Sequence, residues 1–184
     1  FRGTNFDNIC RDTFPLADSW DTTGPPLIWK ATLGEGYAGP AVLNGRVYLM
    51  DYNERRKADQ LRCFSLKSGT ELWRRWYYVD IKRNHGYSRT IPAVTDKYLV
   101  TVGPRSHVMC LDPLSGDLKW VIDMEKEYGI PGKSKGRITP DFYSGQCPLI
   151  DNNVAILAPG GKALMIVVDC ETGNILWSTP NPDT

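Results

Sequence analysis

Three segments of the chain end in the same short pattern, and this repetition constrains the fold more than any other feature of the sequence. The pattern is a serine or threonine, a glycine, three variable residues and a tryptophan. Its copies are residues 68–73, 115–120 and 172–177. The tryptophans recur at intervals of about 50 residues, and the second interval is longer than the first by about ten. Such a period indicates repeated structural units that pack on one another.

Each unit has the same internal order. A proline precedes an apolar stretch that ends at an Asn or Asp turn, and two further apolar stretches follow before the glycine. Short apolar runs between turn residues predict four consecutive strands, with Trp73, Trp120 or Trp177 on the fourth. We expect Gly69, Gly116 and Gly173 to adopt positive φ angles, because the last hairpin needs a left-handed residue. Residues 123–128 are the single helical candidate.

One sheet of this kind cannot cover both of its faces, so the units must pack face to face. Radial packing of four-stranded sheets is the β-propeller architecture, and the tryptophan is large enough to fill the gap between neighbouring blades. We therefore predict an all-β chain that is a partial β-propeller of four-stranded antiparallel blades. The alternative is a β-sandwich in which the tryptophans coincide by chance. The predicted parts are an N-terminal extension at 1–24 and a partial propeller at 25–184, with blades at about 34–78, 85–124 and 141–180.

The propeller is expected to be incomplete. Residues 27–30, Leu-Ile-Trp-Lys, resemble the fourth strand of a blade that would precede the first one. Closed propellers have about 4–8 blades, and three are counted here. The two end faces would then present apolar side chains, which we expect the remaining propeller blades or another protein chain to cover.

Composition excludes several classes of function. The net charge is +1, so no bulk field draws the chain to nucleic acid or to an anionic membrane. The sequence contains no run of about 18 apolar residues, so it predicts no membrane-spanning helix. The opening residues do not form a secretory signal. The five cysteines include no C-x-x-C pair, which argues against zinc-ribbon and thioredoxin-type sites. We predict that most of them are buried free thiols.

Two glycine-rich stretches resemble nucleotide-binding loops but lack the required context. Residues 34–39 match G-x-G-x-x-G, yet Pro40 and a predicted strand follow where a helix should begin. Residues 159–163 lack the first glycine of a phosphate loop, and Ala163 stands where a serine or threonine would bind magnesium. Both stretches are therefore interpreted as connecting loops.

The candidate ligand site is one mouth of the propeller channel, which is lined by the loops that lead into the first strand of each blade. The candidate ligand-binding residues there are His85, Tyr87, Arg89, Tyr143 and Gln146. Tyrosines recur in these loops, and they either form a ring around a ligand or pack against neighbouring loops. Arg89 offers five donors in a planar fork, which suits an anionic or carbonyl group. No catalytic residue can be assigned.

The tryptophan pattern belongs to a longer one, x-x-D-x-x-[ST]-G-x-x-x-W, in which Asp112 and Asp169 supply the aspartate and Ser65 replaces it. This closure resembles the tryptophan-docking motif of the pyrroloquinoline-quinone-type (PQQ-like) β-propeller repeats, across nearly all of residues 25–180. Such repeats occur in quinoprotein alcohol dehydrogenases and in the non-enzymatic barrel-assembly lipoprotein of the bacterial outer membrane. The stretch 85–90 is most similar to bacterial secreted members. The resemblance implies an extracytoplasmic location, periplasmic or secreted.

The resemblance implies either a binding protein or an enzyme. Enzymes of this class hold a calcium ion with carboxylate and amide ligands, and they use a catalytic aspartate and often a disulfide between adjacent cysteines. The chain has no adjacent cysteines and no Asp, Asn or Glu cluster spaced as a calcium site. We therefore expect a non-catalytic propeller that binds or scaffolds a protein or peptide, without a metal or cofactor. The alternatives are part of a dehydrogenase that uses PQQ with calcium, and a carbohydrate-processing accessory protein.

Overall fold

The computed structural model describes residues 9, 11, 13, 15, 17–83, 87–129 and 143–182. These residues form strands and irregular loops, with one short helix, α1 (Met124–Tyr128). The side chain of Asp123 caps α1 by accepting a hydrogen bond from the backbone N–H of Lys126. The helical candidate of the sequence is thus confirmed. Within the described part of the chain, no helix has the length and hydropathy needed to cross a membrane.

The strands form three four-stranded antiparallel sheets, which confirms the predicted fold class. Blade 1 contains β1 (Ala41–Leu43), β2 (Arg46–Asn53), β3 (Ala58–Ser65) and β4 (Glu71–Tyr78). Blade 2 contains β5 (Ala93–Val94), β6 (Leu99–Val102), β7 (His107–Leu111) and β8 (Leu118–Asp123). Blade 3 contains β9 (Leu149–Asp151), β10 (Val154–Leu157), β11 (Ala163–Asp169) and β12 (Ile175–Pro180). Consecutive strands pair in every blade, so Trp73, Trp120 and Trp177 lie on fourth strands as predicted.

The hairpin before each fourth strand has the predicted left-handed glycine. The φ angles are 69° at Gly69, 72° at Gly116 and 77° at Gly173. Beyond each glycine, the register between the third and fourth strands shifts by one residue immediately before the tryptophan. A bulge of this kind re-aims the side chain that follows it. The turn and the bulge together direct Trp73 and Trp120 toward the next blade.

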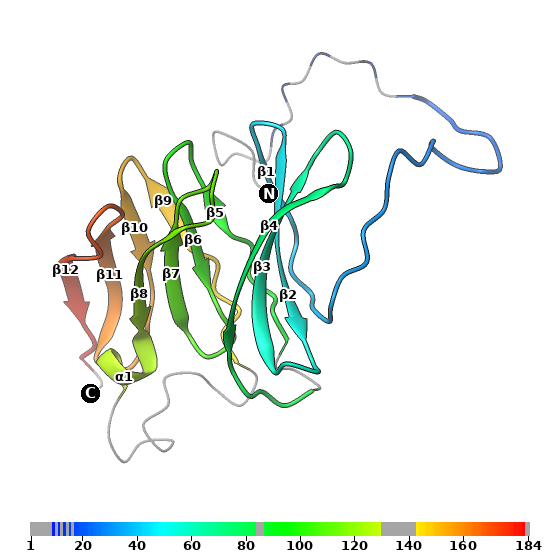
Figure 1. Cartoon of the computed structure of the whole chain (residues 1–184). Helices are drawn as coiled ribbons and strands as arrows, with labels where there is room; N and C mark the ends of the chain where they lie inside the picture. The colour runs from blue at the N-terminus through cyan, green and yellow to red at the C-terminus, as the bar shows by residue number, and fades with distance from the viewer. Residues whose placement is uncertain are drawn as a thin grey trace.

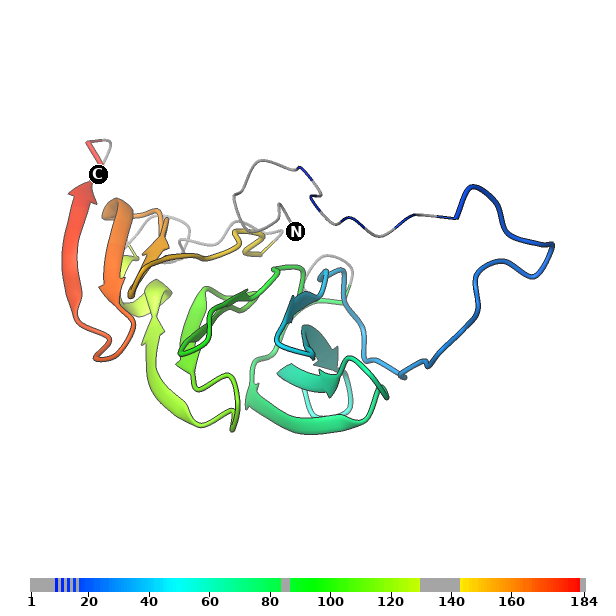
Figure 2. The same cartoon turned by 90° about the horizontal axis from the view of Figure 1, so that it is seen from above.

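The blades pack face to face in a fan. Figure 1 shows the three sheets side by side in chain order, and Figure 2 shows first strands on the inner side and fourth strands on the outer rim. Successive residues of a strand point to opposite faces. Leu99 therefore packs in the core shared with blade 1, together with Tyr48 and Leu61, whereas Val100 packs in the core shared with blade 3. Blade 2 is thus buried on both faces.

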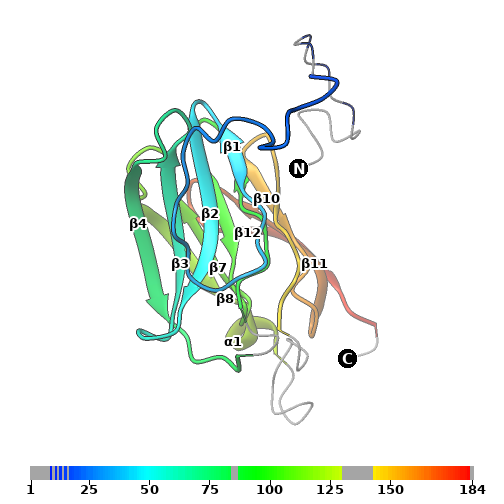
Figure 3. The same ribbon diagram turned by 90° about the vertical axis from the view of Figure 1, so that its right-hand side faces the viewer.

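An extended segment of the N-terminal region, residues 29–36, crosses the face of blade 1 that is turned away from blade 2 (Figure 3). We call this segment the strap and this face the distal face of blade 1. Glu35 and Tyr52 form an isolated antiparallel bridge between the strap and β2. Their backbone N–H groups donate to each other's carbonyls at 3.0 and 2.7 Å. The strap therefore covers a sheet face that a further blade covers elsewhere in the fan.

Candidate functional site

Two of the three repeat tryptophans, Trp73 and Trp120, dock on the glycine turn of the next blade. A β-carbon added to Gly116 would lie 2.8 Å from Cδ2 of Trp73, and one added to Gly173 would lie 2.8 Å from Cγ of Trp120. These separations leave no room for a side chain. The indole rings therefore lie directly against glycine backbone, and a side chain of one blade is joined to a turn of its neighbour.

The strap supplies a tryptophan of the same kind to blade 1. A β-carbon added to Gly69 would lie 2.6 Å from Cδ2 of Trp29, and the indole Nε1 of Trp29 donates to the carbonyl of Leu66 at 2.7 Å. Trp120 makes the corresponding bond to the carbonyl of Cys170 at 2.9 Å. In both cases the acceptor is the residue three positions before the docked glycine. Trp29 thus has the place of a preceding blade's tryptophan, as the sequence indicated.

Trp73 docks without this hydrogen bond. The corresponding carbonyl belongs to Pro113, and it accepts a hydrogen bond from the hydroxyl of Tyr48 at 3.1 Å. The indole Nε1 of Trp73 is buried and has no hydrogen-bond partner among the described residues. The rings of Tyr48 and Trp73 lie beside each other, with centroids 6.0 Å apart. A tyrosine of blade 1 has therefore taken the acceptor that the docking geometry offers to the tryptophan.

The aspartate of the longer motif stabilises the turn that receives the tryptophan. Asp112 accepts hydrogen bonds from the backbone N–H groups of Leu114 and Ser115, both at 2.8 Å. Asp169 makes the equivalent bonds at 3.0 and 2.7 Å. These backbone bonds hold the pKa of both carboxyls below the ordinary value. Ser65 of blade 1 has only a 3.4 Å bond from the backbone N–H three residues later. The first turn is thus the least supported of the three.

Replacing Ser65 with aspartate is expected to raise the free energy of unfolding by about 0.5–1 kcal/mol at neutral pH, because charged acceptors strengthen such bonds. A carboxyl whose pKa is lowered by folding stabilises the fold above its unfolded pKa of about 4, and this gain disappears as the pH falls below that value. Urea unfolding at neutral and at acidic pH measures the effect. Ser65→Asn is the uncharged control, and an equal gain at both pH values would contradict the prediction.

The last tryptophan of the repeat is not docked. Trp177 meets no further glycine turn within the described part of the chain, and it is 48% exposed, whereas Trp120 is 9% exposed. Its neighbours across β11 and β10 are Val167 and Ile156, which form one row with it. Blade 3 therefore presents the side that normally packs on another blade. We call this surface the distal face of blade 3.

The candidate channel-mouth residues lie in different surroundings. His85 lies outside the described residues. Tyr87 is 5% exposed, its hydroxyl donates to the carboxylate of Glu54, and its ring lies 5.5 Å from that of Tyr52. The hydroxyl of Tyr143 accepts a hydrogen bond from the backbone N–H of Lys82 at 2.8 Å. Both tyrosines therefore connect neighbouring loops.

The remaining two candidates lie near the start of blade 3. The Nε of Arg89 is buried and has no hydrogen-bond partner in the described ranges. A β-carbon on Gly145 would lie 3.3 Å from Cδ of Arg89, so this side chain lies against the loop that leads into β9. The amide of Gln146, oriented to satisfy both of its ends, donates to the carbonyl of Ala158 at 2.7 Å and accepts from its N–H. Convergence of all five candidates on one ligand stays a prediction.

A buried carboxyl close to the mouth was not singled out from the sequence. Asp59 of β3 is completely buried and accepts hydrogen bonds from the hydroxyl of Tyr77 at 3.0 Å and from that of Ser88. Burial raises the pKa of Asp59 to about 7, although the two hydroxyl bonds act to lower it. A β-carbon on Gly103 would overlap the Tyr77 hydroxyl, so only glycine leaves room for this group.

The pKa of Asp59 makes the stability of the fold depend on pH. A carboxyl whose pKa is higher in the folded than in the unfolded state favours folding below its unfolded pKa, and this contribution is lost as the pH rises through the folded value. We expect Asp59→Asn to be more stable than the native protein above about pH 7 and to flatten the pH dependence between about pH 4 and pH 7. Urea midpoints across this range measure it, with the exposed Asp117→Asn as control. If the urea midpoints of the native protein and of Asp59→Asn changed with pH in parallel, the raised pKa of Asp59 would be contradicted.

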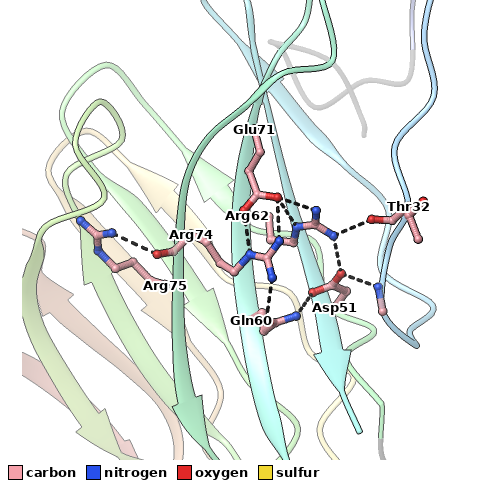
Figure 4. A network of polar contacts seen from close by, with 8 residues as sticks. Thr32, Asp51, Gln60, Arg62, Glu71, Arg74 and Arg75 are labelled. Atoms are coloured by element: carbon pink, nitrogen blue, oxygen red, sulfur yellow. Dashed lines mark hydrogen bonds and ion pairs between the residues drawn. The ribbon is translucent and has the colours of Figure 1, made fainter. Parts of the chain in front are cut away.

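A network of polar side chains, buried at Asp51, Gln60 and Arg62, lies on the distal face of blade 1 (Figure 4). Arg62 forms ion pairs with Asp51 at 3.0 Å and with Glu71 at 2.5 Å. Arg74 pairs with Glu71 at 2.7 Å, and Gln60 donates to Asp51 at 2.9 Å. The hydrogen bond from Arg74, together with Arg62, holds the pKa of Glu71 below its ordinary value. Two positive and two negative charges therefore balance on this face.

The same polar group holds the strap. Nη1 of Arg62 donates to the carbonyl of Thr32 at 2.9 Å, and the backbone N–H of Gly34 donates to Asp51 at 2.7 Å. Gly34 begins the stretch that matches G-x-G-x-x-G, so this glycine-rich stretch makes a structural contact. The sequence signal that would have revealed the group is the presence of Asp51 and Arg62, of opposite charge, within predicted buried strands.

Comparison with known structures supports a propeller. The chain superposes on a europium-containing methanol dehydrogenase with a TM-score of 0.54, 16% identity and coverage of 83% of this chain and 26% of that one. The quinohemoprotein alcohol dehydrogenase from Comamonas testosteroni superposes with a TM-score of 0.56 and 16% identity, over 83% of this chain and 22% of that one. BamB from Moraxella catarrhalis superposes with a TM-score of 0.52 and 13% identity, over 79% of this chain and 40% of that one. At these identities the likeness shows the fold alone, and the chain spans less than half the length of each protein.

The sequence comparisons give the family. No curated protein sequence matches the chain. A family model described as outer membrane protein assembly factor BamB matches residues 57–184, which include all three docking motifs. The resemblance to PQQ-like propeller repeats is therefore confirmed. Because this match covers more than half of the chain, the protein belongs to the family described as outer membrane protein assembly factor BamB.

Proposed function

We propose that this protein is a non-catalytic propeller module that binds another protein through the distal face of blade 3. The observation that carries the proposal is the undocked tryptophan of that face, Trp177, which is 48% exposed. The other exposed apolar side chains on β11 and β12 are Leu164, Met165, Ile175 and Leu176. Membership of a family described as an assembly factor supports a protein as the partner.

The partner is a further four-stranded blade with a glycine turn, supplied by remaining propeller blades or by another protein chain. The row of Ile156, Val167 and Trp177 has the same positions as the row of Val100, Cys110 and Trp120 in blade 2. The row in blade 2 packs on blade 3. Continuation of the same geometry would place a glycine turn under Trp177.

A second element of the proposal concerns the channel mouth, where Arg89 is the residue best suited to hold a ligand. Its buried Nε has no hydrogen-bond partner among the described residues, and a guanidinium binds carboxylate or carbonyl groups through paired bonds. An extended peptide offers both kinds of group. His85, Tyr87, Tyr143 and Gln146 are proposed to complete this site.

Association in solution tests the proposal for the blade 3 face. We expect the 184-residue chain to self-associate and to bind an apolar dye at micromolar concentration, and Trp177→Lys to reduce both. Leu114→Lys is the matched control, because Leu114 is also exposed but lies in a turn away from the face. Sedimentation velocity and dye fluorescence measure the two effects. A monodisperse monomer without dye binding would overturn the proposal.

The alternative function is part of a dehydrogenase that uses PQQ with calcium, and two of the similar structures are alcohol or methanol dehydrogenases. In the described residues, no group of three or more His, Cys, Asp or Glu side chains is placed to hold a metal ion. A near-ultraviolet absorbance scan and a dye-linked alcohol assay with added PQQ and calcium separate the two functions.

The proposed location is extracytoplasmic, periplasmic or secreted. The family description names an outer membrane protein assembly factor, which supports this location. Fractionation of cells that express the protein from its natural gene tests the proposal, with a periplasmic enzyme and a cytoplasmic enzyme as markers. Recovery with the cytoplasmic marker alone would overturn it.

A further inference from the structure

Two cysteines face each other across the interface between blades 2 and 3. Cys110 lies on β7, and Cys170 immediately follows β11. The thiol of Cys110 donates to the backbone carbonyl of Cys170 at 3.4 Å, and the indole of Trp120 donates to the same carbonyl at 2.9 Å. Both cysteines are completely buried and belong to the same apolar core.

The two side chains are close enough to influence each other's titration. Their interaction raises the pKa of the Cys110 thiol and lowers that of the Cys170 thiol. A disulfide requires its two sulfurs to come within about 2 Å of each other. The sulfur of Cys110 already lies 3.4 Å from the backbone carbonyl oxygen of Cys170, so the two cysteines are brought together by the packing of blades 2 and 3.

The equivalent positions at the interface of blades 1 and 2 provide an internal comparison. Cys63 pairs with Trp73 in the strand register as Cys110 pairs with Trp120. The residue three positions before the docked glycine is Pro113 in blade 2, where blade 3 has Cys170. Cys63 therefore lies buried without a second thiol opposite it. Among the described residues, a facing pair of thiols occurs at the second interface alone.

We propose that Cys110 and Cys170 are a covalent modification site, at which a small-molecule disulfide such as oxidised glutathione converts the two thiols into a disulfide that joins blades 2 and 3. The thiolate of Cys170 attacks the oxidant, which forms a mixed disulfide and releases one glutathione thiolate. The thiolate of Cys110 then attacks the sulfur of Cys170, and the second glutathione leaves. The two cysteines lose two protons and two electrons, and the oxidant gains the two electrons.

The burial of the pair determines when this exchange takes place. Neither sulfur is exposed in the packed fan, so the oxidant reaches them while the chain folds or when blades 2 and 3 separate. Once formed, the bond closes a loop of about 60 residues, a length for which a cross-link restricts the unfolded chain strongly. The same burial then protects the bond from reductants in solution.

Refolding in a glutathione redox buffer tests the proposal. After refolding, free thiols are alkylated in denaturant without reductant, and the protein is digested with trypsin. We expect mass spectrometry to find residues 106–119 linked to the peptide that begins at Ala163, at about 2 Da less than the sum of the two reduced peptides. Relative to the reduced protein, Tm is expected to rise by on the order of 5–10 °C.

The controls use the other cysteines. Cys63→Ala should keep the linked peptide, and Cys170→Ala should lose both the link and the shift in Tm. Alkylation of Cys110 and Cys170 as separate peptides in the native protein, or a link from either one to Cys63 or Cys147, would overturn the proposal. This readout needs only the native chain, so it decides the question even if Cys170→Ala fails to fold.

Discussion

Replacing Trp120 with alanine is expected to lower the free energy of unfolding by about 3–5 kcal/mol. The side chain is 9% exposed, rests on Gly173 and donates its indole N–H to the carbonyl of Cys170. Its removal leaves a cavity between blades 2 and 3 and removes a hydrogen bond from a buried carbonyl. Urea unfolding measures the loss as a lower midpoint.

The matched control is Trp177→Ala, because Trp177 has the same position in its repeat. Its side chain is half exposed and undocked, so the expected loss is below about 1 kcal/mol. The difference between the two variants therefore reports the contribution of docking, and not that of the motif position. Equal losses at the two positions would show that the tryptophans stabilise their own blades and that docking contributes nothing.

The second large effect is expected for Gly116→Ala. The φ angle of Gly116 is 72°, which costs an alanine about 1–2 kcal/mol. Its new β-carbon would also lie 2.8 Å from Trp73, and forcing the ring away adds about 1–3 kcal/mol. Gly45→Ala separates the two contributions, because Gly45 has a φ angle of 71° and nothing within 4 Å of its β-carbon position. Gly45→Ala should show the conformational cost alone in thermal or urea unfolding.

A double-mutant cycle makes this test sharper. In a Trp73→Ala background the ring is absent, so Gly116→Ala should cost no more than Gly45→Ala does in the native protein. The coupling between Gly116 and Trp73 would then account for the additional loss. Additive effects of Gly116→Ala and Trp73→Ala would mean that the ring moves aside freely, which would contradict tight docking on the glycine.

The strand order was predictable because it depends on local chemistry. Glycine at 69, 116 and 173 has few structural roles other than a left-handed turn, and apolar runs between such turns leave antiparallel hairpins as the simplest arrangement. The fourth-strand position of the tryptophans follows from the same local order. The resemblance of the segment around Trp29 to a fourth strand was visible for this reason as well, although residues 27–30 pair with no neighbouring strand and remain irregular.

The candidate site was less predictable because its contacts join residues far apart in the sequence. One of the two hydroxyls that meet Asp59 comes from Ser88, in the loop that leads into blade 2, and the carbonyl that meets Arg62 comes from Thr32 of the strap. Sequence patterns indicate which face of a strand is buried, but not which side chain lies opposite. The hydrogen bond from Tyr48 to the Pro113 carbonyl also joins residues far apart in the sequence, and no sequence pattern indicates that Tyr48 bonds there in place of Trp73.

The docking of Trp73 and Trp120 on the following blade gives the two interfaces a direction. Blade 2 contributes a ring to blade 3 and receives the ring of blade 1 on its glycine turn, so successive contacts are head-to-tail, and head-to-tail contacts close into a ring where the rotation between units allows it. A gene duplication that copies one blade therefore copies both parts of the contact, the tryptophan and the glycine turn. The natural cutting point for exchanging fragments lies after the glycine turn, since a cut after Trp120 would separate that ring from Gly173. The segment that can be exchanged as a unit therefore begins and ends between the third and fourth strands of a blade, and not at the boundary between two sheets.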